Sequence, residues 1–197
     1  MTATIRPARP DGEDPAAAAR LHAERIGEGF LVTLGPRFLT RLYGRIARSP
    51  GGVLLLAVDG ERVAGFVAAT TSTRRLYAEF LRHDAVPAGL AAAPAVLRSP
   101  RRVWETWRYG AGGGHGDLPE AEVLSIAVAA DATGNGIGAA LLGAALADLR
   151  DLGAPSAQVV TAVGNDAALA LYERGGFRRH ARTEVHAGVA QEVLVWP

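Results

Sequence analysis

Residues 126–139 read IAVAADATGNGIGA and lead directly into an alanine- and leucine-rich run. The apolar start predicts a strand and the run predicts a helix over 138–152, joined by a turn that holds Gly134, Gly136 and Gly138. The first backbone N–H groups of such a helix have no partner within it, and together with the helix dipole they form a binding site for phosphate. Glycine lets a diphosphate approach the backbone closely. The stretch therefore predicts a ligand that carries a diphosphate.

The glycine turn leaves two classes of ligand open. Residues 134–139 satisfy the G-x-G-x-x-A pattern of dinucleotide-binding domains, so an NAD-binding oxidoreductase is one interpretation and an acyl-CoA site is the other. A dinucleotide-binding domain places this turn after the first strand of a parallel sheet, whereas an antiparallel hairpin and a long insertion precede it here. The context favours acyl-CoA. A turn without any ligand is the weaker alternative, since glycines inside a helix destabilise it by about 1 kcal/mol each.

The remaining segments predict a mixed α/β domain. Upstream, we expect a strand over 3–7, a helix over 14–26 with cap chemistry at Asp14-Pro15, a helix from Gly35-Pro36 to about Ala47, and strands over 53–58 and 62–71 joined by Asp59-Gly60. Downstream, we expect strands over 122–129 and 158–163, a helix over 166–174 and a strand pair after Phe177. We expect a single domain over residues 1–197.

Residues 72–120 are predicted to form a helical insertion within this domain. Helical stretches are expected around 76–83 and 88–97, with prolines at 87, 94 and 100, followed by a glycine-rich loop over 110–116. Long segments of this kind in a compact domain are lids, binding walls or disordered chain. These alternatives stay open from the sequence.

Composition excludes several classes of protein. The chain has 197 residues, of which 49% are hydrophobic and 21% charged, as in soluble globular proteins. It has no cysteine, and all 21 basic residues are arginine, which excludes disulfides, thiolate metal sites, thiol catalysis and lysine Schiff bases. No apolar run approaches the ~20 residues of a membrane-spanning helix, and no secretory signal is evident. The net charge is only +1, so we expect no nucleic-acid partner. We also expect no membrane partner, no metal and a cytoplasmic location.

Residues 165–177 read NDAALALYERGGF and resemble the N-x-x-A-x-x-L-Y-x-x-x-G-F block of the GNAT superfamily of N-acetyltransferases. In that family the block follows a Q/R-x-x-G-x-G/A loop at about this distance, and residues 133–138 occupy the loop position. The resemblance is close over 122–177, looser towards the N-terminus, and absent over 72–120. It implies an α+β fold whose central sheet is mostly antiparallel, contains one splayed parallel pair, and is flanked by helices.

The resemblance also implies a site for acetyl-CoA, the co-substrate of the family. The implied cofactor-binding residues are Ile126, Ala127, Val128, Thr133, Gly134, Asn135, Gly136, Ile137, Gly138, Ala139, Asn165, Ala168 and Tyr172. Tyr172 would protonate the departing thiolate, and its phenol is protonated at neutral pH. Thr133 departs from the family pattern, which has Gln or Arg at this position. Pyrophosphate binding is therefore either weaker or depends on an arginine from elsewhere in the chain.

Glu122 is the candidate general base. It resembles the glutamate that begins this strand in histone-acetylating members, while the alternative position on the later strand, used by ribosomal-protein acetyltransferases, is Val160 here. A surface glutamate without a catalytic role is the competing interpretation. His22, His115 and Glu120 are weaker candidates that a solvated or structural role explains equally well.

The acceptor amine is only loosely constrained by the sequence. By resemblance, the groove involves His22, Arg25, Phe30, Phe38 and Tyr43, although the helical spacing of Phe38 and Tyr43 favours the core. The lid-like insertion favours a small-molecule amine over a peptide amine. A non-catalytic acyl-CoA-binding module stays open as an alternative function, and exposed sheet edges near the C-terminal strands favour a homodimer.

Overall fold

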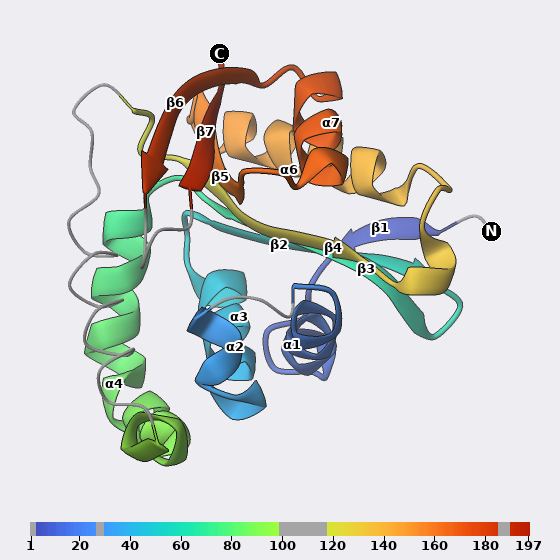
Figure 1. The fold of residues 1–197 in the computed structure, drawn as a ribbon. Helices are drawn as coiled ribbons and strands as arrows, with labels where there is room; N and C mark the ends of the chain where they lie inside the picture. Colours follow the sequence, from blue (N-terminus) through green and yellow to red (C-terminus); the bar gives the residue numbers. More distant parts are fainter. Residues whose placement is uncertain (1–2, 27–29, 99–117, 185–189) are drawn as a thin grey trace.

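The computed structural model describes residues 3–26, 30–98, 118–184 and 190–197, and in these ranges it contains one seven-stranded sheet in the order β1-β2-β3-β4-β5-β7-β6 (Figure 1). In chain order the elements are β1 (Thr4–Pro7), α1 (Asp14–Arg25), α2 (Phe30–Thr33), α3 (Pro36–Arg48), β2 (Gly52–Asp59), β3 (Arg62–Thr70), α4 (Thr73–Arg98), β4 (Glu122–Val128), η1 (Ala130–Ala132), α6 (Ile137–Asp151), β5 (Ala157–Ala162), α7 (Asp166–Arg174), β6 (Arg178–Glu184) and β7 (Ala190–Trp196).

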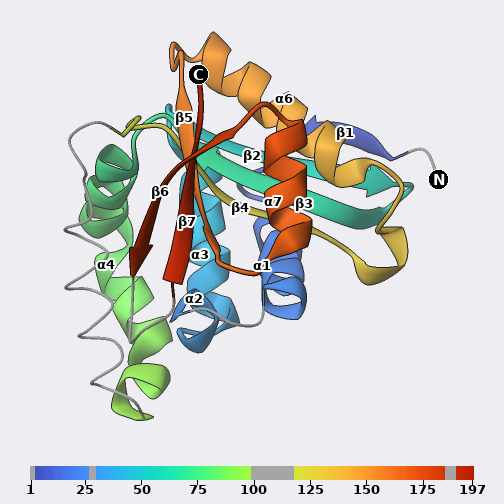
Figure 2. The same ribbon diagram turned by 45° about the horizontal axis from the view of Figure 1, so that its top comes forward.

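Helices cover both faces of the sheet. Helices α1 and α3 lie on one face, α6 and α7 lie on the other, and α4 stands beside α3 at one end (Figures 1 and 2). The hairpin strands β2 and β3 are buried over most of their length because helices cover them from both sides. All neighbouring strands are antiparallel except β4 and β5. This confirms the expected α+β fold, and the sheet lacks the parallel arrangement that a dinucleotide-binding domain requires.

The hairpin turn lies one residue later than predicted. Asp59 pairs with Arg62, so Asp59 ends β2 and the two turn residues are Gly60 and Glu61. Gly60 has a φ of 63°, which is the left-handed conformation that glycine adopts without strain. The prediction of a two-residue hairpin is confirmed, but its residues are shifted.

Helix α1 begins as predicted, although Asp14 does not act as its cap. Asp14 is the first helical residue and follows Glu13, the N-cap, which makes no capping hydrogen bond through its side chain. The Asp14 carboxylate instead accepts hydrogen bonds from the Arg6 guanidinium at 2.6 and 3.0 Å and from the Arg9 backbone N–H at 2.7 Å. These contacts lower the pKa of Asp14 and tie β1 to the helix.

Helix α4 is one continuous helix where the sequence predicted two stretches. It runs through Pro87 and Pro94, residues that remove a backbone donor and usually end or kink a helix. The expected loop over 110–116 lies outside the described residues. The short helix α2 was not predicted, because four residues are too few for a helical period to be recognised.

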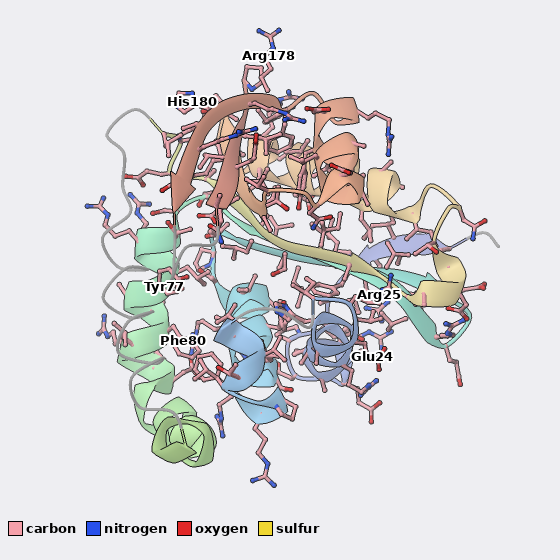
Figure 3. All side chains as sticks on the ribbon, in the orientation of Figure 1. Glu24, Arg25, Tyr77, Phe80, Arg178 and His180 are labelled. Atoms are coloured by element: carbon pink, nitrogen blue, oxygen red, sulfur yellow. The ribbon has the colours of Figure 1, made fainter. Side chains whose placement is uncertain are left out.

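The outer strand β6 is rich in arginine. It carries Arg178, Arg179 and Arg182, and its pairing with β7 is irregular between Arg179 and Ala181; Arg178 points away from the sheet (Figure 3). Charged side chains and bulges on an edge strand oppose pairing with a second chain. The expected homodimer stays a prediction, and this edge does not favour it.

Neither a membrane-spanning helix nor a metal cluster occurs in the described ranges. No helix there combines the length and the apolar character needed to cross a bilayer. No group of three or more His, Asp or Glu side chains there could hold a metal ion.

Candidate active site

The parallel strands β4 and β5 are joined only at their beginnings. Glu122 pairs with Gln158, and the Gln158 backbone N–H donates to the Ala121 carbonyl at 2.8 Å. No further β4–β5 pair follows, although both strands continue for several residues. The two strands therefore separate in the direction of the glycine loop, as the family resemblance implied.

A β-bulge at Leu124 sets the direction of the β4 side chains. Val123 pairs with Ala69 and Ser125 with Ala68, so Leu124 is an extra residue in the ladder. Because paired residues share a face, Glu122, Ser125 and Ala127 are placed on the side of α1 and α3. The alternate set faces α6 and contains Val123, Ile126 and Val128.

The glycine loop places two glycines before helix α6 and one inside it. Gly134 and Gly136 have φ values of 82° and 77°, and a side chain at either position would meet open space. Gly136 is the N-cap, and the first helical hydrogen bond joins the Ala140 N–H to its carbonyl at 3.0 Å. The N–H groups of residues 137–139 therefore have no acceptor within the helix. Gly138 packs close to Leu171, where an added methyl would lie 3.7 Å away.

The polar side chains of the loop fold back onto the 3-10 turn η1. Thr133 Oγ1 donates to the Ala130 carbonyl at 2.7 Å, and Asn135 Nδ2 donates to the Ala132 carbonyl at 3.3 Å. The loop consequently offers backbone rather than side-chain groups to a ligand. Arg62 brings a positive charge to this turn, where it forms an ion pair with Asp131.

The block at residues 165–177 forms helix α7 and its two ends. Asn165 is the N-cap, and its Oδ1 accepts a hydrogen bond from the Ala168 N–H at 3.2 Å. Tyr172 is buried, and its ring lies edge-on to Phe177 with centroids 5.6 Å apart. Burial raises the pKa of Tyr172 to about 12, so its hydroxyl is protonated throughout the neutral range.

Glu122 lies at the point where β4 and β5 begin to separate. It is partly buried, and burial raises the pKa of its carboxyl from 4.5 to about 7. Such a group is half ionised near neutral pH, as a general base in that range should be. Glu120, the weaker candidate nearby, is exposed and forms an ion pair with Arg74 at 3.4 Å.

Three polar side chains from different elements form a buried chain on the α1 and α3 side. His22 Nδ1 lies 2.5 Å from the Tyr43 hydroxyl, which is also hydrogen-bonded to Ser125 of β4. Both His22 and Tyr43 are almost inaccessible, and Phe66 packs against their rings. Burial lowers the pKa of His22 to about 4, so the imidazole is neutral. This environment favours the structural interpretation of His22, and the contact with Ser125 was not predicted.

The other residues expected in the acceptor groove divide between core and surface. Phe38 packs edge-on against Phe80 of α4 with ring centroids 5.5 Å apart, and Arg25 is exposed at the end of α1. The side chain of Phe30 and the whole of His115 lie outside the described residues. The core interpretation of Phe38 and Tyr43 therefore agrees with their packing.

Two shallow hollows lie near the site. One, of 220 Å³, borders the glycine loop and is lined by Ala3, Ile5, Ala57, Asn135, Gly136, Ile137 and Ala140. The other, of 290 Å³, lies at the opposite end of α6, where Arg75 and Leu152 contribute to its wall. Neither is lined by Glu122 or Tyr172.

The shifted pKa values of His22 and Glu122 predict opposite effects of pH on the free energy of unfolding. The unfolded chain protonates His22 at 6.5 and the folded protein at about 4, so stability falls by ~3 kcal/mol as the pH drops through this window. For Glu122 the folded protein takes up the proton first, at about 7 against 4.5, so stability rises by a similar ~3 kcal/mol.

We therefore expect the Glu122→Gln variant to lose stability between pH 7 and pH 4.5 more steeply than the wild type, because only the His22 contribution remains. Urea unfolding at pH 7, 6 and 5 measures this, and groups common to both proteins cancel in the comparison. A His22→Gln variant serves as the control and should show the opposite change in slope. Parallel curves for all three proteins would contradict the assigned shifts.

Known proteins share both the sequence pattern and the fold of this chain. The family model described as "Acetyltransferase (GNAT) family" matches residues 25–177. The mycothiol acetyltransferase of Parafrankia sp. (strain EAN1pec) is 46% identical over 63 residues, which are 32% of this chain and 20% of that protein. That of Geodermatophilus obscurus is 46% identical over 65 residues, which are 32% of this chain and 21% of that protein. The matched stretch thus spans about a fifth of the length of these curated relatives.

Solved structures resemble the chain along its whole length. The phosphinothricin acetyltransferase of Sinorhizobium meliloti, in complex with AcCoA, has a TM-score of 0.64 at 18% identity, covering 100% of this chain and 89% of that one. The ribosomal-protein-S18-alanine N-acetyltransferase of Escherichia coli has a TM-score of 0.62 at 14% identity, covering 99% and 93%. At these identities the likeness concerns the fold alone. From the match over residues 25–177, the chain belongs to the GNAT family of acetyltransferases.

Proposed function

We propose that this enzyme transfers the acetyl group of acetyl-CoA to a primary amine. One observation carries the proposal: β4 and β5 separate after a single pair, Glu122 with Gln158, beside a loop whose glycines adopt positive φ. The separation leaves the backbone edges of both strands unpaired with each other, and an extended ligand can lie between them. The loop beyond them is suited to a diphosphate.

The loop residues fit the diphosphate part of acetyl-CoA. The N–H groups of residues 137–139 lack helical partners, and open space lies beside Gly134 and Gly136. The positive end of the α6 dipole adds to this attraction. Thr133 takes part through its backbone, because its hydroxyl already closes the turn. When bound, acetyl-CoA supplies an acyl thioester whose carbonyl carbon can accept an amine.

Glu122 and Tyr172 are proposed to move the protons of the reaction. An acceptor amine arrives as an ammonium ion, and Glu122 removes the proton that must leave before its nitrogen can form the new C–N bond. Tyr172 donates its phenolic proton to the sulfur as the C–S bond breaks, and the second proton that the nitrogen loses on becoming an amide restores the phenol. The raised pKa of Tyr172 keeps its hydroxyl protonated at neutral pH, and because a thiol near 8.5 is the stronger acid, the transfer to sulfur depends on this return of a proton from the nitrogen.

The β4 backbone is proposed to stabilise the negative charge on the carbonyl oxygen. The bulge at Leu124 changes the direction of the N–H groups that follow it, and Ile126 and Val128 lie on the strand edge where β5 has moved away. A fixed backbone donor of this kind typically contributes ~3 kcal/mol to the transition state.

Two measurements test the proposed function. Acetyl-CoA and CoA should each raise the melting temperature, and NAD should not, since only a ligand specific to the folded protein stabilises it. Thiol release should then require both acetyl-CoA and an amine, for which we propose small-molecule primary amines before peptides. Stabilisation without thiol release across the amine panel would favour a non-catalytic acyl-CoA-binding module. Stabilisation by NAD alone would contradict the proposal.

Replacing Gly136 with valine should weaken acetyl-CoA binding about tenfold or more, equivalent to ~1.4 kcal/mol. The valine side chain would project into the open space beside the loop, and its positive φ of 77° would strain the N-cap. Calorimetric titration with acetyl-CoA measures the loss.

Gly153→Val is the matched control for this variant. Gly153 also has a positive φ, 86°, and open space around it, but it follows the other end of α6. Both variants should lose similar thermal stability, while only Gly136→Val should lose affinity. Equal acetyl-CoA affinities in the two variants would remove the loop from the binding site.

A further inference from the structure

In the first half of helix α4, one side of the helix is buried and packs against α3. Leu76 and Phe80 lie in the core, and Phe80 packs on Phe38. Glu79 accepts a hydrogen bond from Ser49 Oγ at 2.7 Å. Further along, Asp84 forms an ion pair with Arg45 at 2.6 Å, and both side chains are largely shielded from solvent. This part of the helix therefore holds its remaining side chains in defined positions.

A second row of α4 side chains is large, apolar and exposed. Tyr77 and Leu81 are four residues apart, so they are neighbours on the helix surface, and 51% and 59% of their areas are accessible. They stand next to the buried row formed by Leu76 and Phe80. Two large exposed apolar side chains on a well-anchored helix are available to contact a ligand.

Tyr77 lies beside the proposed base. The sheet brings this about, because Glu122 pairs with Thr70, the last residue of β3, and α4 begins three residues later at Thr73. The labelled Tyr77 lies on the side of α4 that faces the rest of the domain (Figure 3). In agreement with this, burial is the main cause that raises the pKa of Tyr77, and the charge of Glu122 raises it further. The aromatic side chain and the carboxylate therefore lie near each other.

Strand β5 adds an apolar side chain on the face of the sheet that carries Glu122. Val160 lies two residues beyond Gln158, the partner of Glu122, and alternation along β5 places both side chains on the face that Glu122 occupies. Its side chain is 37% exposed. Glu122 thus lies near an aromatic residue of α4 and shares its face of the sheet with an aliphatic residue of β5.

We propose that Tyr77 determines acceptor specificity by contacting the acceptor directly, an inference that rests on the proposed function. The acceptor would be a small primary amine whose amino group is attached to an apolar, preferably aromatic, group. Its ammonium group faces Glu122, while its apolar group packs against Tyr77, Leu81 and Val160. An ammonium next to the Tyr77 ring gains cation–π attraction as well. Polyamines and amino sugars would leave this apolar wall uncovered or desolvate their own polar groups against it.

The test compares amines and variants under saturating acetyl-CoA. The wild type should release thiol with 2-phenylethylamine or tryptamine at a kcat/KM at least about tenfold above that for spermidine or glucosamine. Tyr77→Ala should raise KM for the aromatic amines about tenfold with little change in kcat or in acetyl-CoA affinity. Tyr77→Phe keeps the ring and should stay within about twofold of the wild type.

Arg82→Ala is the control on the same helix, because Arg82 is exposed and next to Leu81; it should behave like the wild type. Preference of the wild type for spermidine or glucosamine would overturn the inference, as would an unchanged KM in Tyr77→Ala. In both cases the proposed acetyl transfer would stand, since thiol release was observed. Failure of every amine to release thiol would instead count against the proposed function itself.

Discussion

Replacement of Glu122 with glutamine is expected to lower kcat about 100-fold or more at neutral pH. Glutamine keeps the size of the side chain but cannot accept a proton from the acceptor ammonium. The environment of Glu122 supports this role, because burial raises its pKa to about 7 and the carboxylate lies where β4 and β5 begin to separate. Steady-state thiol release with a saturating amine measures the loss.

The pH profile separates a base from a merely structural glutamate. In the wild type, kcat/KM should rise with pH and level off above an apparent pKa near 7, and this inflection should be missing in Glu122→Gln. Glu120→Gln is the matched control, since Glu120 is exposed, lies two residues away and forms an ion pair with Arg74. It should keep both the rate and the profile of the wild type. Wild-type activity in Glu122→Gln would reassign the proton to another acceptor.

Replacement of Tyr172 with phenylalanine is expected to lower kcat about 100-fold while acetyl-CoA affinity changes little. Phenylalanine keeps the edge-on contact with Phe177 and removes only the hydroxyl. The departing thiolate would then have to take its proton from water. Single-turnover kinetics and calorimetric titration with acetyl-CoA measure the two quantities separately.

Tyr43→Phe controls for the loss of a buried tyrosine hydroxyl. This variant breaks the hydrogen bond to His22 and should lower the free energy of unfolding by ~1 kcal/mol, with kcat within a few-fold of the wild type. Tyr172→Phe should show the reverse, a large loss of rate with nearly unchanged stability. Proportional losses of rate, affinity and stability in Tyr172→Phe would make Tyr172 a structural residue.

Much of the fold was predictable because its signals are local. The apolar strand, the glycine turn and the helix after residue 137 follow one another without interruption, and their period and turn residues are visible in short windows. The α7 block is equally local, since Asn165 caps the helix by bonding the Ala168 N–H three residues later. Turn positions were less certain, as the shift from Asp59 to Gly60-Glu61 shows.

The rest of the site depends on contacts between distant segments. Leu124 becomes a bulge only through its register with Ala68 and Ala69, which no window around residue 124 contains. Ser125 likewise meets Tyr43 only after α3 has packed on the sheet. The continuity of α4 was hidden by Pro87, because intrinsic propensity argues against a helix there.

The pairing of Thr70 with Glu122 has a consequence for how this enzyme could diversify. The chain leaves the sheet at Thr70 and returns to it at Glu122, the directly opposite residue. The segment between these two residues therefore begins and ends at one residue pair of the β3–β4 ladder. Loop length adds to the closure entropy only slowly. Exchanging residues 73–120 for a shorter or longer segment, with the positions of Leu76 and Phe80 kept apolar, would therefore change the acceptor wall and leave the glycine loop and α7 in place. Acceptor specificity and acetyl-CoA binding would then evolve independently of each other.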